Sequence, residues 1–428
     1  MNTTVLKEKI EQFLDETMDL NDLPGLAVGV SIGLDGDCAG SGYSQHSHAG
    51  FSFTGARGYR DYDSGSPLMP DDIFHCASLS KLFTSSAIMK LVEAGSLGLY
   101  DRLSNILPDL KYGSSGNDAP IGDWRFGEIR LWNLLTHTSG LGDLSCYGWD
   151  KPVTDSDALR RYVYESPDTT ALPMLRSPQV NPEYYGVPET DAEGKPLLDS
   201  KGNPAHLFRY SNVAYEILGQ IVAEYSDRMP GADGKLSYED FVARYLLEPA
   251  GMRSSTMKTF ERCDFNDADE RNTCSMVAPY ERASDRSIVP VKHYPYTRQH
   301  APSSTLTSTL SDLLRWGRAH ISSASGKREL LFSKETYDSI WREYATIPNN
   351  GEKMGLGWFM RRQKMSRTDP GSPVQILYGH EGSDDGFRAS FWICPPLEIV
   401  TAVLSNISNA PAKKINKSLF ELACDALR

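Results

Sequence analysis

Residues 74–81 of the chain read FHCASLSK, and they place the hydroxyl of Ser78 three residues before the amine of Lys81. In a helix, side chains at positions i and i+3 lie on one face, so the Lys81 amine can reach the Ser78 oxygen. A serine hydroxyl is a weak nucleophile until a base removes its proton, and a lysine can do this when burial or nearby cations lower its pKa. Ser78 is therefore a candidate acyl acceptor.

The surrounding sequence distinguishes this motif from a second Ser-x-x-Lys, which begins at Ser255. Residues 82–94 are apolar on nearly all sides and are followed by Gly95, which predicts a buried helix that begins at Ser78. Ser255 instead follows a loop and runs into the polar residues 261–264. The alternative interpretation of Ser78 is an N-cap on a core helix.

Two further motifs follow in the chain, each beside a predicted helix or strand. Tyr210-Ser211-Asn212 is the only Tyr-x-Asn in the sequence, and it opens an apolar run that predicts another helix. His380-Glu381-Gly382-Ser383 lies between strand-like runs at 374–378 and 387–393. The first could be a capping turn, and a basic residue two places before a glycine is common. The order Ser-x-x-Lys, Tyr-x-Asn, basic-x-Gly is more informative than any single motif.

With these motifs in this order, the chain resembles the serine β-lactamase and penicillin-binding-protein superfamily, in the branch of class C β-lactamases, D-amino-acid peptidases and related esterases. Segments similar to the family also occur in the usual order, at 23–30 (LPGLAVGV), 134–141 (LLTHTSGL), 248–252 (EPAGM), 355–358 (GLGW) and 403–406 (VLSN). The resemblance implies an antiparallel sheet flanked by helices, an inserted helical domain, and an active site in the cleft between them.

The distribution of strand and helix patterns predicts the same layout. Strand-like runs occur near the N-terminus and again after Gly357, whereas the sequence between them is mostly helical or loop. We therefore predict an α/β (α+β) fold with an antiparallel sheet built from both chain ends. Residues 1–100 and 300–428 would form the sheet domain, and residues 101–299 a mainly helical domain.

One segment is an insertion relative to a minimal version of this fold. Residues 191–196 and 199–204 repeat a turn-forming pattern rich in Gly, Pro and Asp, which predicts an inserted loop or hairpin near 189–206. Because this segment directly precedes Tyr210, it could overhang the cleft and shape substrate choice. The alternative is a solvated loop without a role.

The resemblance implies a role for each motif residue. Ser78 would attack an acyl carbon, while Lys81 and Tyr210 would share the removal of its proton and the delivery of one to the leaving group. The sequence leaves open which of the two is the base. Asn212 offers an amide to Lys81 or to the substrate, and the backbone amides of Ser78 and Ser383 would form the oxyanion hole.

Position 380 departs from the pattern of the β-lactamases, which usually carry Lys-Thr-Gly there to bind the carboxylate of the antibiotic. His380 is mostly neutral at pH 7, Glu381 adds a repelling charge, and Gly382 would let the substrate approach the strand edge. The same His-x-Gly substitution recurs in esterases and peptidases of the family. Arg388 either supplies an anchor for a carboxylate or is an exposed residue of the sheet.

These residues favour a serine hydrolase that acts on a small ester or amide through an acyl-enzyme on Ser78. A β-lactamase or D-Ala carboxypeptidase, and an acyltransferase, are the enzymatic alternatives. A catalytically silent binding protein of the same fold is the third possibility, and the joint presence of Ser78, Lys81 and Tyr210 argues against it.

Net charge, hydropathy and cysteine content limit which partners, compartments and cofactors the sequence is compatible with. The net charge of −12 argues against nucleic acid or an anionic membrane surface. No apolar run is long enough to span a bilayer, and the amphipathic start at residues 1–19 differs from a secretion signal, so we expect a cytoplasmic protein. Seven scattered cysteines without a Cys-x-x-Cys pair indicate neither a disulfide framework nor a zinc site. We therefore expect free thiols, no metal and no organic cofactor, and the oligomeric state stays open.

Overall fold

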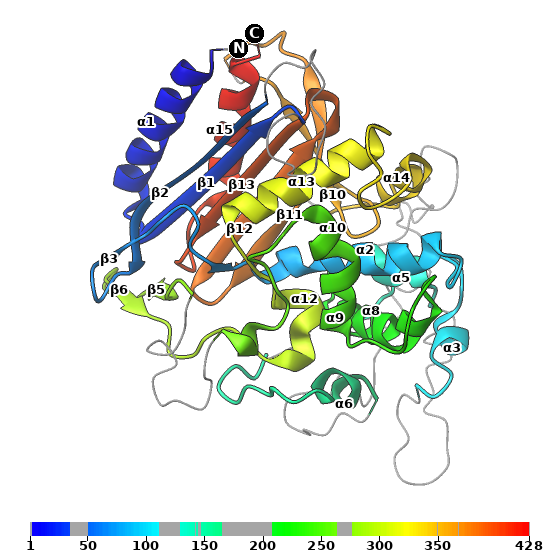
Figure 1. Ribbon diagram of the computed structural model, residues 1–428. Helices are drawn as coiled ribbons and strands as arrows, with labels where there is room; N and C mark the ends of the chain where they lie inside the picture. Colours follow the sequence, from blue (N-terminus) through cyan, green and yellow to red (C-terminus); the bar gives the residue numbers. More distant parts are fainter. Residues whose placement is uncertain are drawn as a thin grey trace, which may run out of the picture.

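The computed structural model describes residues 2–34, 50–110, 129–141, 143, 147–164, 208–262, 276–348, 350–366 and 368–427. Its centre is a nine-stranded antiparallel sheet with the order β3-β2-β1-β13-β12-β11-β10-β9-β8 (Figure 1). The strands are β1 (Gly25–Ile32), β2 (Phe51–Asp61), β3 (Ser66–Pro67), β8 (Ala345–Thr346), β9 (Lys353–Met354), β10 (Phe359–Lys364), β11 (Val374–Asp384), β12 (Phe387–Cys394) and β13 (Ile399–Ser405).

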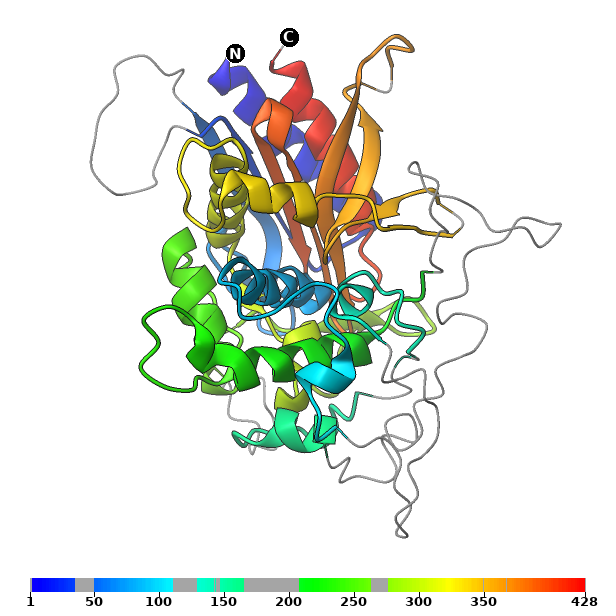
Figure 2. The same cartoon turned by 90° about the vertical axis from the view of Figure 1, so that its right-hand side faces the viewer.

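The two ends of the chain meet in the middle of this sheet. Strand β1 pairs with β2 on one side and with β13 on the other, so Val28 lies opposite both Gly55 and Val403. The two termini accordingly lie close together in Figures 1 and 2. The predicted fold class, an antiparallel sheet built from both chain ends and flanked by helices, is confirmed.

Helices cover both faces of the sheet, because successive strand residues point to opposite sides and both sides of the central strands are apolar. Ala402 and Leu404 of β13 belong to a core on the face covered by α13 (Leu310–Ala324), and α2 (Ser80–Glu93) lies in the same core. Val403, between them, belongs to a second core with α1 (Thr3–Asn21) and α15 (Ala412–Asp425). A helix near each terminus thus packs on this second face, and the N-terminal one agrees with the amphipathic pattern of residues 1–19.

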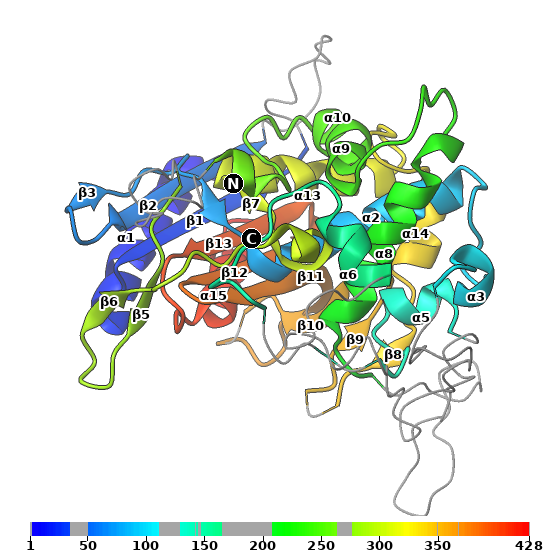
Figure 3. The ribbon, with the colours of Figure 1, turned by 90° about the horizontal axis from the view of Figure 1, so that it is seen from below.

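The remaining helices gather beyond one end of the sheet (Figure 3). They are α3 (Leu103–Ile106), α5 (Leu131–Leu135), α6 (Ala158–Tyr164), α8 (Asn212–Tyr225), α9 (Tyr238–Val242), α10 (Glu248–Ala250), α12 (Ala301–Ser304) and α14 (Lys334–Ile340). Two short ribbons complete the structure, β4 (Phe74–His75) with β7 (Thr307–Ser308), and β5 (Tyr280–Arg282) with β6 (Ile288–Pro290). The domain limits at 100 and 300 stay a prediction, and the hairpin expected near 189–206 lies outside the described residues.

Two local expectations are wrong. The helix does not begin at Ser78, because Ala77–Leu79 form a 3-10 turn and α2 starts at Ser80. Ser78 is therefore not an N-cap. The third motif does not lie between two strands, because β11 continues to Asp384 and pairs with β12 along His380–Asp384.

Within the described residues, no helix combines the length and the apolar character needed to cross a bilayer. Cys76 and Cys394 are buried free thiols, as expected, Cys424 is buried as well, and the other four cysteines lie outside the described residues. Groups of three or more His, Cys, Asp or Glu that could hold a metal ion do not occur in this part of the chain.

The packing of α8 against α12 depends on Gly219, because a Cβ there would overlap the ring of Pro302. We expect Gly219→Ala to lower the free energy of unfolding by about 1 to 3 kcal/mol through overpacking, despite the helix preference of alanine. Thermal denaturation measures the effect. Gly371→Ala is the matched control, since its Cβ would meet only Oδ1 of Asp369 at 3.5 Å. Equal denaturation midpoints for the two variants would show that the contact between the helices relaxes at no cost.

Candidate active site

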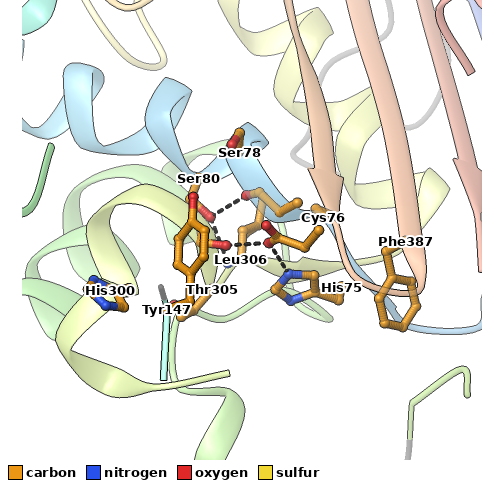
Figure 4. Close-up of polar contacts among 12 residues, drawn as sticks. His75, Cys76, Ser78, Ser80, Tyr147, His300, Thr305, Leu306 and Phe387 are labelled. Carbon is orange, nitrogen blue, oxygen red and sulfur yellow. Dashed lines mark hydrogen bonds and ion pairs between the residues drawn. The ribbon is translucent and has the colours of Figure 1, made fainter. Parts of the chain in front are cut away.

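The turn that carries Ser78 is held by hydrogen bonds from both sides. The hydroxyl of Ser80 donates to the carbonyl of Ala77 (2.7 Å) and accepts from the N–H of Leu306 (2.8 Å). Ala77 itself has φ of +49°, a left-handed conformation that is strained for a residue with a side chain and is concentrated at functional sites. The strained turn places the half-buried Ser78 just before α2, as Figure 4 shows.

A buried carboxylate lies beneath this turn. Asp384, at the end of β11, has its Oδ2 2.7 Å from Nε2 of His75 and also accepts from the hydroxyl of Ser304. The His75 ring packs beside Phe387 (Figure 4). His75 thus joins β4 to the end of β11.

Lys81 is fully buried, and its Nζ is shared among three acceptors. It donates to Oγ of Ser78 (3.2 Å), Oδ1 of Asn212 (2.6 Å) and the carbonyl of Ser303 (2.8 Å). An ammonium has three N–H groups, so these bonds satisfy it completely. Two of them fix the amine, and the third is directed at the candidate nucleophile.

Burial lowers the pKa of Lys81 to about 8, because a charged amine loses its hydration there. The carboxylates of Glu216, Asp143 and Asp384 oppose this shift. At pH 7 about a tenth of the Lys81 side chains would therefore be neutral. A neutral amine beside Ser78 can take up the proton of its hydroxyl.

The amide of Asn212 has no N–H left for a substrate in this conformation. Its Nδ2 donates to both carboxylate oxygens of Asp143 (3.0 and 3.1 Å) and to the hydroxyl of Tyr147 (2.6 Å). Of the two roles considered for Asn212, the geometry therefore favours the positioning of Lys81. Asp143 and Tyr147 belong to no motif recognised in the sequence.

A second buried carboxylate reaches Lys81 through one intermediate residue. Glu216, fully buried on α8, has its Oε1 2.5 Å from the hydroxyl of Ser303 and 3.1 Å from Nδ1 of His300. The carbonyl of the same Ser303 accepts from Lys81. Burial raises the pKa of Glu216, and its bonds to His300 and Ser303 act in the opposite direction.

Tyr210 lies over the amine of Lys81. Its ring stacks on His137 at 4.3 Å between centroids, and Nζ of Lys81 is 5.0 Å from the ring centroid. Nδ1 of His137 accepts from the N–H of Ser211 (3.1 Å), which holds the turn that carries Tyr210. Burial raises the pKa of Tyr210 well above its usual value, although a hydrogen bond with Ser78 lowers it. The phenol thus keeps its proton at neutral pH.

The two ionisable residues of the third motif, His380 and Glu381, face opposite sides of β11. His380 is buried against Phe359, and its Nδ1 lies 2.6 Å from the carbonyl of Glu381. Burial, together with the positive charge of Lys81, lowers the pKa of His380 to about 3. Glu381 accepts from the indole of Trp392 (2.8 Å) on the other face. The expectation that its charge repels an anion in the site is therefore wrong.

Gly382 lies where β11 crosses the turn before Ser78. A Cβ at this position would overlap the carbonyl oxygen of Cys76, so the missing side chain permits this close approach. Ser383, the next residue, is exposed and lies on the wall of a cavity. The structure thus brings Lys81, Tyr210 and Asn212 to Ser78, with β11 alongside.

The second Ser-x-x-Lys is assembled differently. Lys258 pairs with Asp240 (2.7 Å), and Ser255 donates to Asp312 (2.8 Å). Its lysine is thus directed at a carboxylate instead of the serine.

Comparisons with known proteins identify the family of the chain. The beta-lactamase family model matches residues 10–423. The chain is 26% identical to penicillin-binding protein 4* of Bacillus subtilis over 71% of its own length and 56% of that protein. It is 27% identical to the probable hydrolase M10 of a Phoma species over 47% of its own length and 31% of the relative. The chain thus spans less than two thirds of the length of these curated relatives.

Solved structures with the same fold cover nearly the whole chain. The octameric penicillin-binding protein homologue from Pyrococcus abyssi has a TM-score of 0.65 at 21% identity, covering 100% of this chain and 77% of that one. The D-amino acid amidase from Ochrobactrum anthropi has a TM-score of 0.64 at 15% identity, covering 99% of both chains. The class C beta-lactamase from Rhodobacter sphaeroides has a TM-score of 0.60 at 18% identity, covering 98% of this chain and 99% of its own. With the family model matching almost from end to end, the chain belongs to the beta-lactamase family.

Proposed function

We propose that the chain is a serine hydrolase that acts on a small ester or amide through an acyl-enzyme on Ser78. The observation that carries the proposal is the buried amine of Lys81, 3.2 Å from Oγ of Ser78, with its pKa lowered to about 8. A buried lysine that is partly neutral near physiological pH is suited to general-base catalysis.

In the proposed acylation, neutral Lys81 takes the proton of Ser78 while Oγ bonds to the substrate carbonyl carbon. The N–H groups of Ser78 and Ser383 would stabilise the resulting oxyanion. Tyr210, a protonated phenol, gives its proton to the leaving group as the bond to that group breaks, and the proton on Lys81 then restores the phenol. A water molecule repeats the sequence against the acyl-enzyme and releases the acid.

The state of His380 favours this function over a β-lactamase. A neutral, buried imidazole offers no charge to the carboxylate of an antibiotic. The geometry disfavours a catalytically silent binding protein. Burial of an amine costs desolvation free energy, and such a protein has no use for a buried amine beside an accessible serine.

Trapping the acyl-enzyme tests the proposal. The full chain is incubated with p-nitrophenyl butyrate, quenched in acid, digested and mapped by mass spectrometry. We expect one butyryl group on the peptide that contains Ser78, and no comparable adduct with nitrocefin. Acylation of the Ser255 peptide, or no acylation by any ester, would refute the assignment.

The pH dependence of turnover tests the role of Lys81 as the base. We expect kcat/KM for p-nitrophenyl butyrate to rise with pH through a pKa of about 8, since only neutral Lys81 accepts a proton. Glu216→Gln removes the carboxylate that most strongly raises this pKa, so the rise moves to lower pH. Steady-state rates from pH 5 to pH 10 measure the shift.

Glu224→Gln is the matched control, because Glu224 lies on the same helix and pairs with Lys235 at 2.9 Å. Its profile should equal that of the wild type. A Glu216→Gln profile that is unmoved, or moved to higher pH, would contradict the electrostatic coupling between Glu216 and Lys81.

A further inference from the structure

A cavity of about 510 Å³ opens beside Ser383. Its walls come from the loop of Tyr147 and Trp149, from Lys292 and His293, and from the turn between β11 and β12 with Arg388. The lining of the cavity thus includes a residue of the third motif but not Ser78. The chemistry of its walls therefore limits which substrates the site can accept.

The cavity lies at the acyl end of the proposed site. The ring of Tyr210 is 6.2 Å from that of His380, at the other end of the third motif. Ser383 is three residues further along β11, a distance of about 10 Å in a strand. If Tyr210 protonates the leaving group, that group lies toward His380 and the acyl chain toward Ser383.

Arg388 holds a fixed guanidinium at the wall of this cavity. It lies directly opposite Ser383 across the β11–β12 pair, and its Nη1 donates to the carbonyls of Asp384 (2.8 Å) and Phe387 (2.7 Å). A guanidinium has five N–H groups, so those on Nε and Nη2 stay available to a ligand. Among the described residues, no carboxylate forms an ion pair with it.

The carboxylates around the cavity oppose this positive charge only in part, since Asp384 and Asp385 act on Arg388 without forming an ion pair with it. Asp384 is buried and already bound by His75 and Ser304. Asp150, Glu281 and Asp385 are exposed, where water screens their charges more than that of the half-buried Arg388. Lys292 adds a positively charged group to the wall, which His293 also lines. The wall nearest Ser383 therefore favours an anion.

An apolar surface lies next to this cationic wall. The rings of Tyr147 and Trp149 stack at 4.7 Å with an angle of 17°, and the hydroxyl of Tyr147 is tied to Asn212. A carbon chain can lie along these rings while a carboxylate at its end reaches Arg388.

Resting on the proposed function, we propose that the substrates are esters or amides whose acyl group carries a carboxylate, which Arg388 binds in this cavity. Monoesters and monoamides of dicarboxylic acids are the simplest members of this class. A planar guanidinium suits a carboxylate because two parallel N–H groups can bind its two oxygens.

The test compares mono-p-nitrophenyl adipate with p-nitrophenyl hexanoate, whose acyl chains are equally long and differ in the terminal carboxylate. We expect the wild type to prefer the adipate ester by tenfold or more in kcat/KM. Arg388→Gln should lower this preference by about tenfold with little change for hexanoate, and Arg388→Lys should lower it partially. Arg362→Gln, on an exposed site of β10, is the matched control and should leave the preference unchanged.

Four outcomes distinguish failure of the acyl-carboxylate site from failure of the hydrolase proposal. Equal use of both esters, or equal effects of Arg388→Gln on both, would overturn the acyl-carboxylate site while leaving the hydrolase intact. Turnover that does not acylate Ser78 would overturn the hydrolase proposal instead. Calorimetric binding of adipate and hexanoate to Ser78→Ala tests the cavity without turnover, and equal affinities there would also overturn the carboxylate site.

Discussion

Replacement of Ser78 by alanine is expected to reduce kcat for p-nitrophenyl butyrate by about 10⁴-fold or more, because the acyl group then has no oxygen to bond to. The remaining rate would come from binding and from the oxyanion donors. Steady-state hydrolysis and the amplitude of the initial burst measure the loss. The protein should stay folded, since Lys81 keeps its bonds to Asn212 and Ser303 in the variant.

Ser255→Ala is the matched control for this substitution, since it removes the serine of the other Ser-x-x-Lys. Ser255 bonds to Asp312 and Ser308, so this variant should lose some stability and keep its turnover. If Ser78→Ala retained more than a tenth of the wild-type rate, the nucleophile would have to be another residue.

The fold could be predicted because its signals are local and repeated. The apolar runs at 26–32 and 399–404 coincide with β1 and β13 to within one residue at each end. The start of α2 was misplaced, because a left-handed Ala77 is determined by the contacts of Ser80 and Leu306 and not by the preference of alanine.

The candidate site could be predicted only where its residues belong to ordered motifs. Glu216 was missed, although its spacing of four from Asn212 places both on one face of α8. Asp143, Tyr147 and Ser303 carried no such signal, because only tertiary packing brings them to Asn212 and Lys81. The motifs thus indicate the reacting groups, whereas the groups that set their charge are visible only in three dimensions.

The role of Gly382 likewise depends on tertiary packing that the motif alone does not show. The sequence suggested a glycine that admits the substrate, whereas the structure gives it a packing role against the carbonyl of Cys76. A strand that crosses so close to the Ser78 turn would keep the N–H of Ser383 on the same side as the candidate nucleophile. The proposed oxyanion hole would then depend on this contact as much as on the two amides themselves.

Lys81→Met tests the feature on which the proposed chemistry depends most, and we expect it to lower kcat/KM for p-nitrophenyl butyrate by about 10³- to 10⁴-fold. Methionine has a similar length and no proton acceptor, so the rise of the rate with pH through about 8 should disappear together with the activity. The substitution also removes a cation that lowers the pKa of His380, so this pKa should rise above its value of about 3. Histidine resonances followed by NMR during a pH titration measure that change independently of turnover.

Lys81→Arg separates the charge of Lys81 from its ability to lose a proton. A guanidinium keeps the cation beside Asn212 but stays protonated at any pH that the protein tolerates, so it cannot serve as the base. We therefore expect Lys81→Arg to be nearly as inactive as Lys81→Met, while the pKa of His380 stays low. An active Lys81→Arg would mean that Lys81 acts only through its charge, and the phenol of Tyr210 would then have to take the proton from Ser78 despite the burial that raises its pKa.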